Sequence, residues 1–362
     1  MTSLLRRLTQ STRLRPVDLL PGLFLGTTAL LVIAVGGEVR VDTEKLVEWA
    51  IFTLNVVLII AVPTFVRFER SFWRPEYRNL PGHALLIVLV VVALFTYRWG
   101  AVFDPLAMLI LVFVSGLVWG VGRRRERFTA RQLLVRWSPL IVSAYIYVNL
   151  RWFVSSINPR IMDGWLADLD LRLFGAHFTV LAEKIQNPWL TEWFSFHYSA
   201  YILYPLVLGT LLYYQRKDEA FEDFLLAFCL SMYLGFIGYL LVPAVGPIKE
   251  LFDLYSTPTV PGMGMDEFRR IVDAKYRYTR DTFPSLHTAN SLLCLLIMRK
   301  THPKLFWVFL FGEVNLLLAT IYLRMHYTVD LIAGALLAFF VVWIAPRINR
   351  AAGVPAPESS SP

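Results

Sequence analysis

Charged side chains are scarce in this 362-residue chain. They make up 17% of it, whereas hydrophobic residues make up 56% and the mean hydropathy is +0.54. This composition excludes an ordinary soluble protein and leaves room for about ten membrane-spanning helices of about 20 residues each. Cysteine is nearly absent, because only Cys229 and Cys294 occur, both within apolar runs. A disulfide scaffold is therefore excluded.

The sequence also lacks a continuous basic face, although its net charge is +8. The lysines and arginines form short clusters between apolar runs, a pattern typical of a multi-pass membrane protein and not of a nucleic-acid binder. No carboxylate cluster and no His/Cys spacing suggests a zinc or magnesium site. We therefore expect no metal, no other cofactor and no nucleic acid.

Long apolar stretches are the main feature of the chain, and ten of them predict membrane-spanning helices. They lie near residues 18–37, 47–66, 81–97, 103–122, 133–155, 192–214, 221–243, 284–299, 304–323 and 328–346. If the N-terminus is cytoplasmic, the inner connections carry more than half of the 35 lysines and arginines, as the positive-inside rule requires. The sequence thus predicts an all-α integral membrane protein with both termini in the cytoplasm, located in the inner (plasma) membrane if the organism is a bacterium.

Two polar regions on the predicted outer side stand apart from the spans. Segment 156–191 is too polar to cross a membrane and predicts an amphipathic helix on the outer surface. The second region is segment 244–283, which carries Lys249, Arg269, Arg270, Lys275, Arg277 and Arg280, and Arg324 lies on the same side at the outer end of the ninth span. Binding of an anionic group explains such a cluster. The alternative is a solvated loop that pairs these residues with Asp266, Glu267, Asp273 and Asp281.

Three segments with chemically useful residues are predicted to lie at one membrane depth on the outer side: 242–249, 283–288 and 324–330. In the last of them, His326 and Asp330 are four residues apart, so on a helix they share a face. A carboxylate there fixes the imidazole tautomer and leaves the other ring nitrogen as a nucleophile or base. The alternative is a His–Asp pair with a structural role alone.

The segment 283–288 opens the eighth predicted span. Pro284 suits the first turn of a helix, and a helix N-terminus binds anions. Ser285 adds a hydroxyl donor, and His287 can protonate a leaving oxygen. The alternative is a simple helix cap beside an interfacial histidine. Two histidines, a carboxylate, arginines and a helix N-terminus together favour phosphoryl transfer through a phosphohistidine without a metal.

These residues resemble the signatures of the type 2 phosphatidic acid phosphatase superfamily, which comprises membrane lipid phosphatases and phosphotransferases. Its Pro-Ser-x-His signature is matched at Pro284, Ser285 and His287, and its His-x-x-x-Asp signature at His326 and Asp330. The resemblance implies that His326 attacks phosphorus, Asp330 supports it and His287 protonates the leaving group. It also implies a six-helix phosphatase-like core bundle.

The sequence departs from the family pattern where the phosphate is usually held. The first signature, a lysine followed by Arg-Pro, is absent, and Lys249 stands in its place. The Ser-Arg that usually opens the third signature falls on Ala319 and Thr320. The residues expected to bind the substrate phosphate are Ser285, Arg324, Lys249 and Arg280. Segment 170–175 resembles the inositol phosphorylceramide synthase branch, which moves a phospho-headgroup between lipids.

We therefore expect an N-terminal region with four spans (1–132), a six-helix catalytic core (133–350) and a disordered tail (351–362). The expected substrate is a phospholipid or other lipid phosphate, with water or a lipid hydroxyl as acceptor. Competing hypotheses are a lipid or ion transporter, for which Glu313 near mid-membrane is the supporting residue, and a catalytically silent scaffold. Aromatic residues of the sixth span, Tyr198 and Tyr201, together with His197, are candidates to line a lipid pocket.

Overall fold

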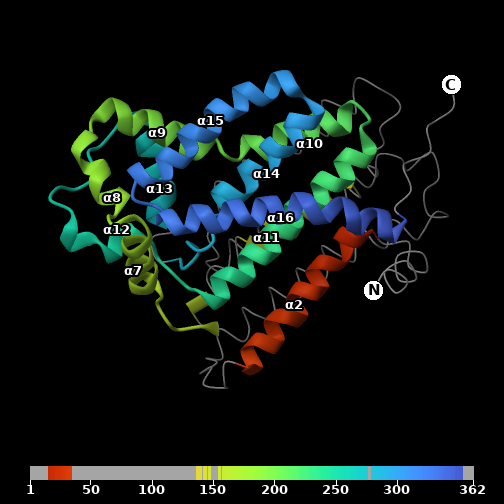
Figure 1. The fold of residues 1–362 in the computed structure, drawn as a ribbon, viewed down its shortest axis with the longest axis horizontal. Helices are drawn as coiled ribbons and strands as arrows, with labels where there is room; N and C mark the ends of the chain where they lie inside the picture. The colour runs from red at the N-terminus through yellow and green to blue at the C-terminus, as the bar shows by residue number, and fades with distance from the viewer. Residues whose placement is uncertain are drawn as a thin grey trace, which may run out of the picture. The chain divides into compact units, whose positions relative to one another are not determined.

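The computed structural model describes residues 15–34, 157–275 and 279–353, together with short pieces between 136 and 155 (Figure 1). All regular secondary structure in these ranges is helical, which confirms the predicted all-α class for this part of the chain. The spans predicted near 47–66, 81–97 and 103–122 lie outside the described residues, as does the tail beyond residue 353.

Three of the described helices are long and apolar enough to cross a membrane: α11 (Asp218–Leu241), α15 (Pro303–Tyr322) and α16 (Thr328–Ala352). They coincide with the spans predicted near 221–243, 304–323 and 328–346. The predicted first and eighth spans are also helical, as α2 (Pro16–Ala34) and the shorter α14 (Leu286–Thr301). The total of ten spans stays a prediction.

The span predicted near 192–214 is wrong as a single helix. The structure has two shorter helices there, α9 (Pro188–Ala200) and α10 (Leu203–Tyr214), with a turn at Tyr201 and Ile202. Pro205 explains the break, because a proline lacks the backbone N–H and its ring clashes with the carbonyl four residues earlier. That carbonyl belongs to Tyr201, and it accepts a hydrogen bond from the Tyr204 N–H at 3.1 Å instead.

Short elements cover the end of the bundle where α11 and α15 end and where α14 and α16 begin (Figure 1). They are α7 (Asp163–Phe174), α8 (Phe178–Leu181), η2 (Ala182–Ile185), α12 (Pro247–Glu250), η3 (Phe252–Leu254) and α13 (Gly264–Lys275). The amphipathic helix predicted in 156–191 corresponds to α7. It buries Leu166 and exposes Trp165 and Leu173, but it also buries two of its carboxylates.

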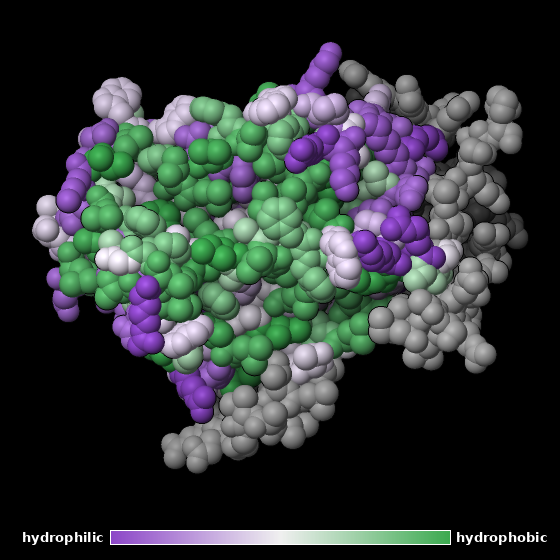
Figure 2. All heavy atoms as spheres, in the orientation of Figure 1, coloured by the Kyte–Doolittle hydropathy of each residue, from purple (hydrophilic) through white to green (hydrophobic). Residues whose placement is uncertain are grey.

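Helix α14 lies at the centre of the bundle, packed against α10, α11, α15 and α16. Its start and α16 approach closely at Gly334, where a Cβ atom would lie only 2.4 Å from the Ser285 carbonyl oxygen. On the face shown in Figure 2, hydrophobic side chains cover most of the described surface, and hydrophilic side chains gather in groups at its edges. A surface of this kind suits a lipid environment.

Candidate active site

His326 and Asp330 form the pair that the sequence predicts, although by a different local structure. His326 lies in the loop before α16, whose N-cap residue is Tyr327, so the two residues do not share a helical face. The Asp330 Oδ2 atom accepts the Tyr327 backbone N–H at 2.9 Å and lies 3.3 Å from His326 Nδ1. Asp330 is fully buried and His326 is 4% exposed, so the contact is shielded from water.

The second histidine, His287, lies on the other side of the His326 ring from Asp330. His287, in the first turn of α14, places its Nδ1 atom 3.3 Å from His326 Nε2. Because a carboxylate only accepts, His326 carries its proton on Nδ1, and Nε2 holds the lone pair. His287 then donates from Nδ1. The three side chains thus form one hydrogen-bonded chain from Asp330 through His326 to His287.

Aromatic rings fix the orientation of His287. Tyr198 stacks on its imidazole with ring centroids 4.6 Å apart and planes 29° apart, and the ring of Tyr201 lies 4.3 Å away. Both tyrosines were candidates for a lipid pocket on sequence grounds, and the structure places both beside His287. His197 instead packs among the rings of Trp193, Phe196 and Phe311.

Ser285 is the N-cap of α14, so Pro284 lies before the helix and not in its first turn. The Ser285 hydroxyl oxygen accepts hydrogen bonds from the Thr288 backbone N–H at 3.3 Å and from the Thr288 hydroxyl at 3.1 Å, and the residue is fully buried. These contacts match the capping alternative considered for this segment. Phosphate binding by Ser285 stays a prediction.

Arg324, two residues before His326, is the best-placed cation of the predicted cluster. It is only 3% exposed and has a positive φ of 61°. Its Nη1 atom donates to the Thr257 carbonyl at 3.0 Å, and its guanidinium lies 3.7 Å from the centre of the Tyr255 ring. Its Nε and Nη2 atoms are buried without a hydrogen-bond partner. That edge of a guanidinium carries two parallel N–H groups, which is the geometry for binding two oxygens of a phosphate.

Charges around Arg324 are held in defined states. Burial lowers the pKa of Arg324, an effect that Tyr255 and Glu183 oppose, and burial raises the pKa of the Tyr255 phenol. The Glu183 carboxylate lies 3.9 Å from Arg324 Nη2. A hydrogen bond from the Thr257 hydroxyl is the largest cause that lowers the pKa of Glu183. A carboxylate, a phenol and a buried cation thus lie together at Arg324, two residues before His326 in the chain.

The other predicted phosphate ligands lie in different settings. Lys249 is exposed on α12. The Arg280 Nη1 atom donates to the backbone carbonyls of Asn158, Pro159 and Arg160 at 3.1, 2.8 and 3.1 Å. Arg280 therefore ties the chain before α7 to the segment before α14.

Arg269 pairs with an acidic residue, as the alternative explanation of the basic cluster predicts, but the pair is buried. Arg269 Nη2 lies 2.7 Å from Asp266 Oδ1, and Arg269 Nε donates to the Ser195 hydroxyl at 3.1 Å. Arg269 and Asp266 are 6% and 2% exposed. This pair therefore fastens α13 to α9 instead of lying in a solvated loop.

Asp163 and Asp170 lie directly beside the loop of His326, and neither was predicted to contribute to the site. Asp170 on α7 accepts the Thr328 N–H at 2.9 Å and the Val329 N–H at 2.8 Å. Asp163 on the same helix accepts the N–H groups of 245 and 246 at 2.8 and 2.7 Å and the Tyr327 hydroxyl at 3.0 Å. Their spacing of seven residues, two helical turns, was the available signal, because it puts both on one face.

The arrangement offers a nucleophilic nitrogen, a proton donor facing it and a buried cation two residues away. Within the ranges that the structure describes, no set of three or more His, Cys, Asp or Glu side chains lies close enough together to hold a metal ion. The ring nitrogens of His326 and His287 and the buried guanidinium of Arg324 suit nucleophilic attack at an electrophilic centre that carries negative charge.

Comparisons with known proteins give distant relatives of this chain. A phosphoinositol dihydroceramide synthase of Bacteroides thetaiotaomicron is 25% identical over 277 residues, covering 69% of this chain and 87% of that protein. An uncharacterized protein of Methanocaldococcus jannaschii is 24% identical over 217 residues, covering 58% of this chain and 83% of that protein.

A PA-phosphatase related-family protein of Dictyostelium discoideum is 30% identical over 127 residues, 34% of this chain; the aligned part is 23% of that protein. No solved structure is significantly similar to the chain. The sequence profile of the PAP2 superfamily matches residues 164–344, which is half of the chain and includes both histidines, Asp330 and Arg324. The chain therefore belongs to the PAP2 superfamily, as the resemblance of its signatures predicts.

Proposed function

We propose that the protein is a membrane-embedded enzyme that transfers a phosphoryl or phospho-headgroup from a lipid by way of a phosphohistidine on His326. The observation that carries the proposal is the chain of contacts in which Asp330 holds Nδ1 of His326 and His287 faces its Nε2 at 3.3 Å. Membership in the PAP2 superfamily and the synthase among the relatives support a lipid phosphatase or phosphotransferase.

In the first half-reaction, the lone pair on His326 Nε2 attacks phosphorus, and the bond from phosphorus to the leaving oxygen breaks. His287 enters this step as the doubly protonated imidazolium. The entering phosphoryl group takes the place of the hydrogen bond between the two rings, so a His287 N–H comes to face the leaving oxygen, donates its proton to it and leaves a neutral His287 ring. Asp330 stabilises the positive charge on the His326 ring. The products are a phosphorylated His326 and a protonated leaving group.

In the second half-reaction, His287 accepts the proton of the acceptor hydroxyl, whose oxygen attacks the phosphorus of the phosphohistidine. The nitrogen–phosphorus bond breaks, and both histidines return to their starting states. The Nε and Nη2 edge of Arg324, which makes no hydrogen bond, is proposed to hold two phosphate oxygens throughout. Lys249 and Ser285 are proposed as further phosphate contacts.

The acceptor that we propose is a lipid hydroxyl, as in headgroup exchange between lipids. The support is the Bacteroides relative, a phosphoinositol dihydroceramide synthase, and the aromatic surroundings of His287, where the rings of Tyr198 and Tyr201 pack against the imidazole. A sphingolipid is accordingly the first acceptor to test. We also propose that the site faces the extracytoplasmic side and that residues 1–132 form an N-terminal region, of which α2 packs against the core helix α11.

The test is incubation of the purified protein in lipid vesicles with a mixed, labelled lipid extract, with products identified by mass. A headgroup or phosphate that moves from one lipid to another, or to water, supports the proposal and names the acceptor. Lipids that cross the vesicle membrane without any chemical change would instead favour the transporter hypothesis. The matched control is His326→Ala, which should give no product.

A further inference from the structure

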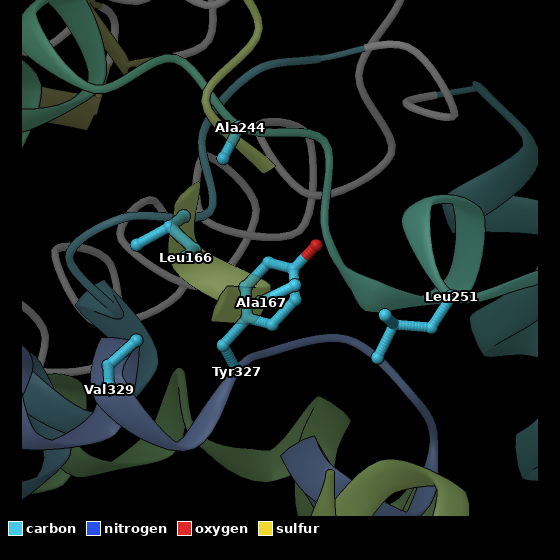
Figure 3. Packing of buried hydrophobic residues seen from close by; sticks show 6 residues of the cluster. All are labelled: Leu166, Ala167, Ala244, Leu251, Tyr327 and Val329. Carbon is cyan, nitrogen blue, oxygen red and sulfur yellow. The ribbon is translucent and has the colours of Figure 1, made fainter. Parts of the chain in front are cut away.

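The segment that carries the nucleophile is held from one side by α7. Figure 3 shows the Tyr327 ring between α7, which contributes Leu166 and Ala167, and Leu251 beyond α12. Tyr327, Leu166 and Ala244 are fully buried members of this cluster, and Val329 belongs to it as well. The backbone immediately after His326 is therefore packed against α7.

Two buried carboxylates of α7 complete this contact with hydrogen bonds. A helix leaves its first N–H groups without partners inside the helix, and a side chain at the N-cap usually satisfies some of them. Tyr327, the N-cap of α16, directs its hydroxyl to Asp163 instead. The two carboxylate oxygens of Asp170 accept the N–H groups of Thr328 and Val329 in its place, so α7 caps α16 from outside.

We infer that Asp170 and Asp163 are positioning residues for the nucleophile: by fixing residues 327–329 from α7, they set the ring of His326 against Asp330 and His287. This inference rests on the proposed function. The path is short, because the Tyr327 N–H itself binds the Asp330 carboxylate that orients His326. Asp163 also accepts the N–H groups of residues 245 and 246. In the same stretch of chain, the Ile248 N–H donates to the Arg324 carbonyl at 3.1 Å. The start of segment 324–329 is therefore connected to α7 through residues 245–248, and its end is bound by α7 directly.

Asp170 and Asp163 are 2% and 1% exposed, whereas Asp168 on the same helix is exposed. Asp168→Asn is therefore the matched control. In Asp170→Asn the amide keeps one oxygen to accept from an N–H group, but its NH2 group faces the second N–H, and the start of α16 shifts. A displacement of about 1 Å in an aligned nucleophile costs up to about 100-fold in rate.

We expect Asp170→Asn to lower kcat by about 10- to 100-fold with KM within about twofold of the wild type, and Asp168→Asn to leave both unchanged. Tyr327→Phe removes only the hydroxyl bound to Asp163 and should lower kcat by a smaller factor, about 3- to 10-fold. The substrates are phosphatidic acid, which has a poor leaving group, and 4-nitrophenyl phosphate, which has an acidic one. The deficit should be equal with both, because attack and not protonation is impaired.

A merely structural role would lower the amount of folded protein or the melting temperature and leave kcat per folded molecule unchanged. If Asp170→Asn does not fold, Tyr327→Phe decides alone. Wild-type kcat in Tyr327→Phe and in folded Asp170→Asn, or recovery of either variant with 4-nitrophenyl phosphate, would overturn the inference. Absence of turnover in the wild type with every substrate would overturn the proposed function itself, so the two failures are distinguishable.

Discussion

The Nε2 atom of His326 and the Nδ1 atom of His287 face each other at 3.3 Å, although the residues are 39 positions apart in the chain. The hydrogen bond to Asp330 leaves His326 with a lone pair directed at His287, and the tyrosine rings hold His287 in place to meet it. In the proposed mechanism this relationship gives the two histidines different roles, and the leaving group of the substrate can separate those roles experimentally.

The first prediction concerns this division of labour. His326→Ala should abolish the covalent phospho-enzyme, because the attacking nitrogen is gone. His287→Ala should slow the reaction of phosphatidic acid by about 100- to 10,000-fold yet largely spare 4-nitrophenyl phosphate, whose leaving group needs little protonation. Acid-labile phosphate trapped on the protein from a labelled donor measures the first effect. Label that persists in His326→Ala would place the nucleophile elsewhere.

The second prediction concerns the anion site. Arg324→Lys should lose about 30- to 1,000-fold in kcat/KM, because a lysine cannot present two parallel N–H groups to a phosphate. Arg280→Ala should mainly lower the melting temperature, since its Nη1 atom holds the carbonyls of 158–160. Equal activity loss in both variants, with unchanged melting temperatures, would mean that the two arginines share the phosphate.

Much of the fold was predictable because lipid imposes simple rules on sequence. The lengths of the apolar runs located α11, α15 and α16 to within a few residues, apart from the C-terminal end of α16, since a spanning helix needs about 20 apolar residues. The break between α9 and α10 was missed, because apolar content continues through Tyr201 and Ile202 and only Pro205 marks it. Apolar content therefore predicts the length of a spanning segment well, but it does not show where a helix breaks within that segment.

The site was predictable in part for a related reason. His326 and Asp330 are close in sequence, so their contact needed no knowledge of the packing, whereas the contact with His287 depends on the crossing of α14 and α16 at Gly334. Asp163 and Asp170 were missed because a polar, amphipathic segment suggests carboxylates that face water. In this helix they face inward, where hydrogen bonds from the backbone N–H groups of residues 245, 246, 328 and 329 make their burial favourable.

The third prediction concerns the orientation in the membrane. Glu267 on α13 and Lys300 at the far end of α14 are both exposed, whereas Asp266 is buried and unsuitable for labelling. In a variant without native cysteines, Glu267→Cys should react with an impermeant thiol reagent on intact cells, and Lys300→Cys should react only after the cells are permeabilised. The reverse pattern would turn the active site to the cytoplasm.

The fourth prediction concerns acid stability. Burial alone would raise the pKa of Asp266, but the Gly262 N–H, Arg269 and Ser195 bind the ionised form and lower it below its ordinary value of 3.8. A lowered carboxyl pKa stabilises the fold above the unfolded-state value, and this contribution disappears as the pH falls through the folded-state value.

Asp266→Asn should therefore melt below the wild type near neutral pH, and the difference should vanish as the pH falls below 3.8. Melting temperatures of both proteins, recorded from about pH 7 to about pH 3, measure this. Asp168→Asn, which changes an exposed carboxylate, is the control. A difference between Asp266→Asn and the wild type that stays constant over the whole range would mean that the charge of Asp266 contributes nothing.

The last prediction concerns the crossing that brings the histidines together. A Cβ atom at Gly334 would lie 2.4 Å from the Ser285 carbonyl oxygen and 3.1 Å from Thr288 Cβ, so Gly334→Ala must push the start of α14 away from α16. We expect a loss of about 1–3 kcal/mol in the free energy of unfolding and about a 10- to 100-fold loss in kcat, because His287 moves with α14 away from His326.

Gly22 in α2 is the matched control, since a Cβ atom there meets nothing within 4 Å and alanine favours a helix. Gly22→Ala should keep wild-type activity and equal or exceed the wild-type melting temperature. Thermal unfolding and turnover of both variants against the wild type measure the effect. Because a separated pair of histidines impairs attack and protonation together, the lost activity of Gly334→Ala should return only in part with 4-nitrophenyl phosphate. Full activity in Gly334→Ala would show that α14 and α16 do not need this close crossing to align the two rings.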